Sequence, residues 1–416
     1  MNILYLHQYF NTPAMSGGTR SYEIARRLVA MGHHVDLLTS DQTASDNRWR
    51  VTSESGIQVH WFSSKYSNKM DFSRRILAFI RFAVAATKHA RKFDYDVVFA
   101  TSTPLTIAIP GVLTARMAKV PLVFEVRDLW PAVPIAVGAL RSPISKLAAY
   151  WLERFAYFNS ARIIALAPGM KSDIVSGGIP DELVTVIPNG CDNNLFDPIR
   201  ESKSVDPYEV YPGLKEKTVI LYAGTMGIVN GITYIVRLAA TLQKFKSDVR
   251  FVLIGDGRMK AESIQLAEDL DVLNKCLYFL DPMPKTSVAE WMRIADFSII
   301  TYEGPELCYR DSVANKFFDA LAAGKPIVAN YSGYATQIAV DNKCGFILPQ
   351  NLEVAAQMLM EKIADQEWRI AARENGKRLA TTVFNRDQQV LQLSTVLEAA
   401  VSDPISIKRV IKKGDI

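Results

Sequence analysis

A short segment near the C-terminal end combines two carboxylates, an amide and a lysine at spacings that suit anion binding. It contains Asp311, Asn315, Lys316 and Asp319 and leads through a Gly-Lys-Pro turn into an apolar strand. In a helix, Asn315 and Asp319 would share one face because they are four residues apart. Lys316 would lie in the first turn, where backbone amides and the helix dipole favour an anion. This arrangement suits a nucleotide-sugar, although an ordinary capped helix with a solvated charged face would show the same pattern.

Three glycine-bearing loops follow strand-like segments, where glycine lets backbone amides approach a phosphate or a sugar closely. They contain Gly17 and Gly18; Gly224, Thr225 and Gly227; and Gly255, Gly257 and Arg258. Tight strand-to-helix turns also need glycine, so each loop alone is a weak signal. The first loop is not a GxGxxG motif and lacks the matching acidic residue at the end of the second strand, which argues against a dinucleotide.

Two successive series of strand and helix patterns position these residues. Apolar strands are expected at residues 3–7, 35–39, 97–100, 121–124 and 163–166, and again at 219–224, 250–255, 277–280, 297–300, 326–328 and 345–348. Helical patterns lie between the strands. The first covers residues 20–31 approximately, and the last ones cover residues 353–400 approximately. The alternation predicts an α/β protein with two doubly wound domains and parallel sheets covered on both faces. Ligands bind such sheets at the carboxyl ends of strands, so we expect a site in a cleft between the domains.

The length of 416 residues exceeds one ordinary core, and composition gives the boundaries. We expect one domain over residues 1–198 and a second over 218–385. The linker between them, 199–217, is rich in Pro, Asp, Glu and Lys. Residues 386–416 are expected to form a C-terminal helix and a basic tail that return towards the first domain.

Composition excludes several classes of protein. The chain is 49% hydrophobic without low-complexity tracts, which indicates a folded globular protein. Its first residues indicate a strand, not a signal peptide, and no run of about eighteen apolar residues could span a membrane. The four cysteines are scattered without a CxxC pair, so we expect reduced thiols in the cytoplasm and no zinc site. Asp94 and Asp96 imitate a metal-binding DxD but directly precede a strand, so we assign them no metal role.

The net charge of +5 lies entirely in the first half, where residues up to 198 include 21 Lys or Arg and 16 Asp or Glu. Much of the excess falls in residues 65–92, where eight basic side chains accompany only Asp71 and alternate with apolar ones. This pattern is typical of a basic amphipathic helix on an anionic membrane surface. A helix packed on its own domain with solvated charges would also fit. Nothing in the segment matches a nucleic-acid-binding module.

The order of motifs resembles the retaining glycosyltransferases of family 4. That family has the GT-B fold, in which two Rossmann-like doubly wound domains face each other across a cleft. The resemblance covers nearly the whole chain. It is carried by Gly17-Gly18, Gly32-His33-His34-Val35, Pro188-Asn189-Gly190-Cys191-Asp192, Gly255-Asp256-Gly257 and the segment from Asp311 to Asp319.

The resemblance implies that the N-terminal domain binds the acceptor and the C-terminal domain the nucleotide-sugar. In the family a Glu-x7-Glu pair borders the donor, and Asp311 and Asp319 occupy those positions. It therefore implies that Asp319 holds ribose hydroxyls and that Asp311 lies by the donor sugar. Both acids are one methylene shorter than the family's. The family's usual Arg and Lys after the first C-terminal strand are absent, so phosphate charge falls to loop amides, Lys316 and Arg258.

The segment from Glu125 to Pro131 follows an apolar strand of the first domain, so its polar groups would face the cleft. We expect Glu125, Arg127 and Trp130 to bind the acceptor and Asp128 to approach its attacking hydroxyl. An internal Arg–Asp pair that fixes the loop is the alternative. Together with Tyr-Ala-Gly-Thr-Met-Gly after the linker and Asn-Lys-Phe-Phe-Asp near the end, this segment resembles the L-fucosamine transferase-like branch of O-antigen and capsule synthesis.

The resemblance implies a metal-independent enzyme without a cofactor, peripheral on the cytoplasmic membrane. It would move a sugar such as N-acetyl-L-fucosamine from a UDP-sugar to a saccharide on undecaprenyl diphosphate, with Asp311, Lys316 and Asp128 as catalytic residues. Lys316 and amides would stabilise the departing UDP. Two alternatives stay open, a UDP-sugar 2-epimerase of the same fold and a non-catalytic membrane-associated scaffold. The sequence does not indicate the oligomeric state.

Overall fold

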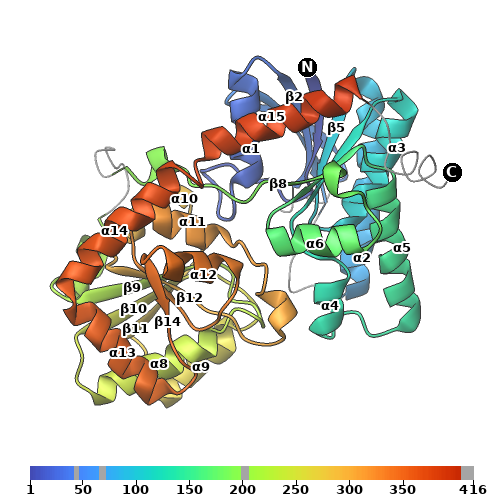
Figure 1. Cartoon of the computed structure of the whole chain (residues 1–416). Helices are drawn as coiled ribbons and strands as arrows, with labels where there is room; N and C mark the ends of the chain where they lie inside the picture. The colour runs from blue at the N-terminus through green and yellow to red at the C-terminus, as the bar shows by residue number, and fades with distance from the viewer. Residues whose placement is uncertain (42–45, 65–71, 198–205, 404–416) are drawn as a thin grey trace. The chain divides into compact units, whose positions relative to one another are not determined.

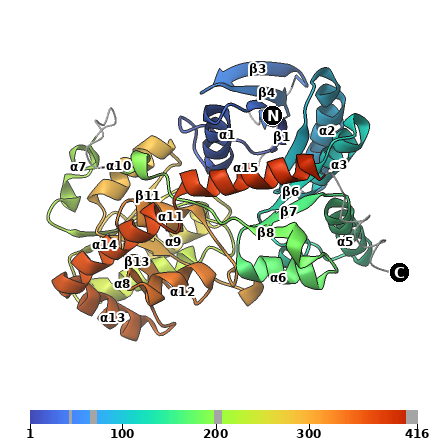
Figure 2. The same ribbon diagram turned by 45° about the horizontal axis from the view of Figure 1, so that its top comes forward.

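The computed structural model describes residues 1–41, 46–64, 72–197 and 206–403 and divides into two units (Figures 1 and 2). Unit 1 consists of Met1–Thr12, Thr19–Pro188 and the chain from Asp387 onward. Unit 2 consists of Pro13–Gly18 and Asn189–Arg386. Each unit has its own sheet and its own buried apolar clusters. The expectation of two Rossmann-like α/β domains is confirmed.

Unit 1 is built on an eight-stranded sheet in the order β3-β4-β2-β1-β5-β6-β7-β8. Its strands are β1 (Asn2–Leu6), β2 (His34–Asp41), β3 (Trp49–Glu54), β4 (Ile57–Ser63), β5 (Val97–Thr101), β6 (Leu122–Val126), β7 (Arg162–Ala165) and β8 (Val184–Val186). The central strands are buried almost throughout, which explains their continuous apolar runs.

The outer strand β3 departs from the parallel sheet that the sequence predicted. It pairs antiparallel with β4, and Glu54 lies opposite Ile57. The two residues between them, Ser55 and Gly56, both have positive φ angles, of 52° and 83°. A two-residue turn of this kind matches the twist of two antiparallel strands. The hairpin therefore forms locally, without the crossover helix that parallel strands need.

Helices cover both faces of this sheet. They are α1 (Arg20–Ala30), α2 (Phe72–His89), α3 (Ala108–Ala118), α4 (Ala132–Ala136), α5 (Pro143–Phe158), α6 (Pro168–Ser176) and α15 (Arg386–Ser402), with short 3₁₀ turns at Ala90–Lys92, Leu105–Ile107 and Asp181–Leu183. Helix α15 comes from the far end of the chain and runs beside α1 in both views (Figures 1 and 2). Its residues Val390, Leu393, Leu397 and Ala400 share a buried cluster with β1 and β2. The three- and four-residue spacing places these residues on one helix face.

Unit 2 contains a six-stranded sheet, entirely parallel, in the order β11-β10-β9-β12-β13-β14. Its strands are β9 (Thr218–Ala223), β10 (Val249–Ile254), β11 (Leu277–Leu280), β12 (Phe297–Ile300), β13 (Ile327–Ala329) and β14 (Gly345–Ile347). All six lie where the sequence predicts them, because each is a short apolar run bounded by polar or glycine residues.

The helices of unit 2 are α7 (Pro207–Val210), α8 (Ile232–Lys244), α9 (Lys260–Asp269), α10 (Lys285–Ile294), α11 (Asn315–Ala322), α12 (Tyr334–Asp341), α13 (Leu352–Ala364) and α14 (Gln366–Thr381), with 3₁₀ turns at Asn193–Leu195, Pro212–Leu214 and Glu306–Cys308. The described part of the expected linker is packed into this unit, since Leu214 is buried and the Tyr211 ring packs edge-on against Trp291. No helix in the described parts of the chain is both long and apolar enough to cross a bilayer.

Candidate functional site

The start of helix α11 lies in unit 2, and no side chain caps its first turn. Ala314 occupies the N-cap position and has no side-chain oxygen, so no side-chain cap bond is made there. The preceding loop is held by Asn189, whose Nδ2 donates to the carbonyl oxygen of Val313 over 2.6 Å. First-turn N–H groups without a capping side chain, together with the helix dipole, favour a phosphate or carboxylate.

Lys316 lies in this first turn, as the sequence predicts, and its side chain is buried. The ammonium Nζ donates to the hydroxyl of Tyr222 over 2.9 Å and lies 4.1 Å from the centre of the same ring. The ring centre of Tyr302 is 5.8 Å away. Burial lowers the pKa of Lys316 to about 7. A bound anion would raise this pKa again, because an opposite charge favours the protonated form.

Tyr222 connects Lys316 to the glycine-bearing loop that follows β9. Its hydroxyl donates to the carbonyl oxygen of Thr225 over 2.6 Å. A Cβ placed on Gly224 would lie 3.7 Å from Lys316 Nζ. The structure thus brings together Gly224, Thr225 and Lys316, three of the residues that the sequence assigned to the donor. Tyr222 was not among them, although its place at the end of a strand that leads into this loop could have indicated it.

The loop after β10 packs directly on the loop after β9. Gly255 has a φ of +152°, and a Cβ on it would come within 1.9 Å of the carbonyl oxygen of Gly224. A Cβ on Gly257 would come within 2.3 Å of the carbonyl oxygen of Met226. Contact between the two backbones therefore requires both glycines, with or without a ligand. Arg258 follows with an exposed side chain.

The N-terminal loop that contains Gly17 and Gly18 groups with unit 2. A Cβ on Gly18 would lie 2.6 Å from Nδ2 of Asn315, so no larger residue fits there without displacing that amide. Gly17 is exposed and has a φ of +121°. Gly18 and Asn315, predicted from distant parts of the sequence to contact the same donor, are therefore neighbours.

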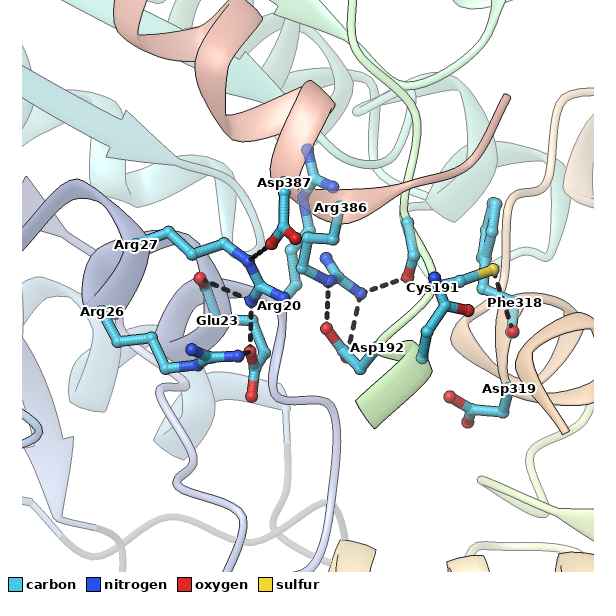
Figure 3. A network of polar contacts seen from close by, with 12 residues as sticks. Arg20, Glu23, Arg26, Arg27, Cys191, Asp192, Phe318, Asp319, Arg386 and Asp387 are labelled. Carbon is cyan, nitrogen blue, oxygen red and sulfur yellow. Dashed lines mark hydrogen bonds and ion pairs between the residues drawn. The ribbon is translucent and has the colours of Figure 1, made fainter. Parts of the chain in front are cut away.

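Asp319 is buried on the same helix, but it is already paired. Lys285 at the start of α10 contacts its Oδ2. Asp192 and Arg386 form a second buried ion pair close by, on the chain segments that lead into and out of unit 2 (Figure 3). Burial raises the pKa of Asp319, while Lys285 opposes the shift. Sequence reasoning missed Lys285, which lies far from Asp319 along the chain.

Asp311 also has a cationic partner and lies outside the helix. It precedes α11 by four residues, and its Oδ2 accepts from Nε of the adjacent Arg310 over 2.7 Å. The next residue, Ser312, exchanges a 2.7 Å hydrogen bond with the hydroxyl of Tyr302, whose ring also neighbours Lys316. The carboxylate is therefore neutralised locally in the ligand-free protein.

In unit 1 the predicted acceptor residues lie at the carboxyl end of β6, and Glu125 departs from its predicted role. Its side chain is fully buried, where it accepts from Arg20 Nε over 3.2 Å and from the hydroxyl of Thr101. Burial raises its pKa, but the Arg20 guanidinium outweighs burial and holds the pKa below its usual value. Arg20 also donates to the carbonyl oxygen of Pro188 over 2.9 Å. Glu125 thus fixes the start of α1 and offers no exposed surface to an acceptor.

Arg127, Asp128 and Trp130 follow Glu125 and are only partly covered or exposed. Arg127 Nη1 lies 3.3 Å from Nε2 of His7, and Asp128 accepts from the Thr103 hydroxyl over 3.2 Å. Burial, with Arg127 nearby, holds the pKa of His7 well below its usual value, so His7 is neutral and accepts from Arg127. The Arg–Asp pair considered for this loop is not found among these described side chains, and the ion pair of the segment joins Glu125 to Arg20 instead.

An open hollow of about 620 Å³ lies elsewhere in unit 1. It is lined by residues of β3, α2 and their surroundings, among them Trp49, Ile80, Arg81 and Lys88. No residue assigned to donor or acceptor lines it. Within the ranges that the structure describes, no group of three or more His, Cys, Asp or Glu is arranged to hold a metal ion.

Comparison with known families covers most of the chain. Residues 17–190 match the model of the glycosyl transferase 4-like domain, and residues 210–379 match that of the glycosyl transferases group 1. The loops around Gly224 and Gly255 and the start of α11 all fall within the second match, whereas Arg127 and Asp128 fall within the first.

Individual relatives are distant but extend over long stretches. A D-inositol 3-phosphate glycosyltransferase of Jonesia denitrificans is 24% identical over 92% of this chain and 91% of its own. A lipopolysaccharide 1,2-N-acetylglucosaminetransferase of Salmonella typhimurium is 23% identical over 50% of this chain and 55% of its own. Among solved structures, Anabaena Alr3699/HepE in complex with UDP and glucose superposes with a TM-score of 0.70 at 20% identity, covering 96% of this chain and all of the other.

Proposed function

Because the chain belongs to the GT-B glycosyltransferases, with a 4-like domain followed by a group 1 domain, we propose that it transfers a sugar from a UDP-sugar with retention of anomeric configuration. Relatives that act in lipopolysaccharide synthesis, and a structural neighbour that binds UDP, support this assignment. The observation that carries it is the buried Lys316 at the uncapped start of α11, linked through Tyr222 to the loop after β9.

The chemistry proposed for this site is stabilisation of a leaving group. The bond from the anomeric carbon to the β-phosphate oxygen of UDP breaks, and charge develops on that oxygen. We assign stabilisation of this charge to Lys316 and the first-turn amides of α11, whose effect a preorganised, water-poor environment would strengthen. The acceptor hydroxyl oxygen forms the new bond on the same face of the sugar, and its proton passes to the departing phosphate oxygen. No metal is assigned a part.

The proposed ribose contact is Asp319, and the proposed contact near the sugar is Asp311. Both carboxylates have cationic partners in the ligand-free protein. Lys285 engages Oδ2 of Asp319, so we assign the hydroxyl contact to Oδ1. On unit 1 we assign acceptor binding to Arg127 and Trp130, and contact with the attacking hydroxyl to Asp128.

The finer assignments rest on sequence resemblance. Three segments resemble the L-fucosamine transferase-like branch: residues 222–227, residues 125–131 and residues 315–319. This resemblance supports an N-acetylated deoxyhexosamine, such as N-acetyl-L-fucosamine, as donor sugar. The acceptor would be a saccharide on undecaprenyl diphosphate, and the enzyme would work on the inner face of the cytoplasmic membrane. Helix α2 supports this location, since Arg74, Arg81 and Lys88 are exposed on it. Lys65 and Lys69 of the same basic segment lie outside the described residues.

A UDP-sugar screen tests the assignment, because a ligand that binds only the folded state raises thermal stability. We expect UDP and one UDP-linked N-acetylated deoxyhexosamine to stabilise the wild type and the control Lys325→Met but not Lys316→Met. Lys325 is a suitable control because it is a second buried lysine of unit 2, with a pKa lowered by burial to about 8. Equal stabilisation of both variants would exclude Lys316 from the nucleotide site.

Product analysis then separates the classes of activity. Transfer to a lipid-linked saccharide acceptor, with retained configuration, supports the proposal. Release of an epimerised sugar without acceptor would identify a 2-epimerase instead. A wild-type protein that no UDP-sugar stabilises would contradict an enzymatic role for this site and favour a scaffold.

A further inference from the structure

Helix α5 exposes the residues that an amphipathic helix usually buries. Ile144, Leu147 and Trp151 are 80%, 72% and 62% exposed, and Tyr150 beside them is 46% exposed. Spacings of three and four residues place Ile144, Leu147 and Trp151 in one stripe. A surface helix of a soluble protein normally turns such a stripe towards the core, and a contiguous exposed one marks an interaction surface.

Helices α3 and α2 neighbour α5 in the same unit and also expose apolar side chains. Helix α3 packs against both α5 and α2, and it lies beside α5 in both views (Figures 1 and 2). The Trp151 ring stacks on Phe155, and the guanidinium of Arg116 on α3 lies 5.8 Å from the centre of the Phe155 ring. The next residue of α3, Met117, contacts Arg91 in the 3₁₀ turn that follows α2. The exposed apolar side chains on α2 and α3 are Ile76, Leu77, Ile80, Val84, Leu113 and Met117, of which Ile80 and Val84 line the hollow beside β3.

The charge of these three helices identifies the partner. Residues 72–92, 108–118 and 143–158 contain a single acidic side chain, Glu153. The basic side chains on the same segments are Arg74, Arg75, Arg81, Lys88, Arg91, Lys92, Arg116, Lys146 and Arg154. A surface that combines cations, aliphatic side chains and an exposed Trp and Tyr matches the interface of an anionic bilayer, where indole and phenol rings lie at the level of the headgroups.

We propose that α5 is an interfacial helix that inserts Ile144, Leu147 and Trp151 into an anionic bilayer. This inference extends the proposed membrane location, which otherwise depends on the charge of α2. It adds an apolar contribution to membrane binding. Apolar insertion persists in salt, whereas attraction between surface charges is screened. Helix α5 thereby fixes which face of unit 1 lies on the membrane.

Vesicle flotation of the full-length protein tests the proposal. The vesicles contain phosphatidylcholine with about 30% phosphatidylglycerol, in about 0.1 M or about 1 M salt. The test variant is Ile144→Ser/Leu147→Ser/Trp151→Ser. The control is Val354→Ser/Ile370→Ser/Val383→Ser, which changes unit 2 residues that are 53%, 51% and 62% exposed. We expect the wild type and the control to keep part of their binding in high salt, and the α5 variant to bind at least about tenfold more weakly at both salt concentrations.

Binding of the α5 variant equal to that of the wild type would overturn the proposal. The proposal would also be overturned if the wild type did not bind vesicles but dimerised, and the α5 variant stayed monomeric. The exposed face of α5 would then be a protein interface. The single variant Leu147→Glu, whose charge stays solvated in the unbound protein, checks that lost binding does not reflect misfolding; it should bind as weakly as the triple variant.

The same samples separate this inference from the proposed enzymatic function. Stabilisation by the UDP-sugar should be unchanged in the α5 variants, since no α5 residue belongs to the donor site. Loss of vesicle binding with intact UDP-sugar stabilisation supports both proposals. Vesicle binding that follows α5 while no UDP-sugar binds any variant would support the interfacial helix and contradict the transferase assignment.

Discussion

The buried ammonium of Lys316 lowers the folding stability of the ligand-free protein. Its amine lies against Tyr222 in a buried position that lowers its pKa to about 7, far below the usual 10.5. The unfolded chain therefore holds a proton that the folded chain gives up between about pH 7 and pH 10.5, so the stability contribution of this residue rises with pH across that window. A buried charge without an anionic partner is costly unless a ligand supplies the partner.

We therefore expect Lys316→Met to stabilise the ligand-free protein while it abolishes nucleotide binding. The gain at pH 7 should be roughly 2–4 kcal/mol, since each pKa unit is worth about 1.4 kcal/mol and the lost contact with Tyr222 offsets part of it. Denaturant unfolding at pH 7 and at pH 10 measures it. The gain should shrink at the higher pH, and a variant less stable than the wild type at both pH values would contradict this account of Lys316.

Affinity for the UDP-sugar should fall as the pH is raised above about 7. In the complex the diphosphate stabilises the ammonium, so binding above the free-state pKa takes up one proton. The affinity should therefore decrease by up to about tenfold per pH unit between pH 7 and pH 10. Calorimetry in two buffers of different ionisation enthalpy would detect the proton uptake. The Lys325→Met control should show the same pH dependence, and a pH-independent affinity would exclude Lys316 as the phosphate contact.

Asp319 has two roles that a single substitution confounds, because it is both the proposed ribose contact and the partner of Lys285. Lys285→Met would leave a buried carboxylate unpaired, which should destabilise unit 2 by about 3 kcal/mol. Adding Asp319→Asn should recover most of that stability but not UDP-sugar binding. A double-mutant cycle on unfolding free energies measures the coupling. If the double variant bound the UDP-sugar as tightly as the wild type, the ribose role of Asp319 would be refuted.

The sequence could predict part of this site and not the rest, for a physical reason. Lys316 in the first turn of a helix follows from local periodicity and from the strand that comes after it. Its partner Tyr222 is 94 residues away along the chain, and the partner of Asp319 is 34 residues away. Such pairs are set by tertiary packing, which one sequence does not show. The burial of Glu125 had the same cause, since Arg20 reaches it from a different element.

At the scale of elements, strands were predictable wherever burial on both faces produced a continuous apolar run. That condition holds for β1 and β9, and both were located. It fails for β3, none of whose residues is fully buried, so no apolar run marked it. Its partner β4 was missed as well, although it is buried, and the turn at Ser55 and Gly56 was the available signal for both.

Helix α2 carries the charge component of the proposed membrane contact. We expect Arg74→Glu/Arg81→Glu/Lys88→Glu to bind anionic vesicles about a hundredfold more weakly at low salt, since each basic residue near such a surface contributes about 1 kcal/mol. The three side chains are exposed, so the fold should tolerate the change. Flotation at low salt measures binding, and neutral phosphatidylcholine vesicles serve as the control. Unchanged binding to anionic vesicles would remove α2 from the membrane face.

At the scale of the molecule, the chain forms two units with separate cores, and the first core is completed by the last described helix. The residues of α15 that join the β1–β2 cluster are about 350–400 positions from the strands they cover. In unit 2, by contrast, the core is completed by α13 and α14, which directly follow its last strand. Domains with their own cores respond separately to perturbation, since each has its own unfolding free energy.

Scanning calorimetry of the full chain should therefore separate the two units. Leu397→Ala removes a fully buried side chain from the core of unit 1, at a cost of about 2–5 kcal/mol, which should lower one transition by about 5–15 °C. A UDP-sugar should raise the other transition, because the nucleotide contacts are assigned to unit 2. Leu359→Ala makes the same change in the core of unit 2. It should lower the transition of unit 2 and leave the transition of unit 1 unchanged. A single transition that moves with all three perturbations would mean that the units unfold as one body, and the separate response inferred from their cores would be wrong.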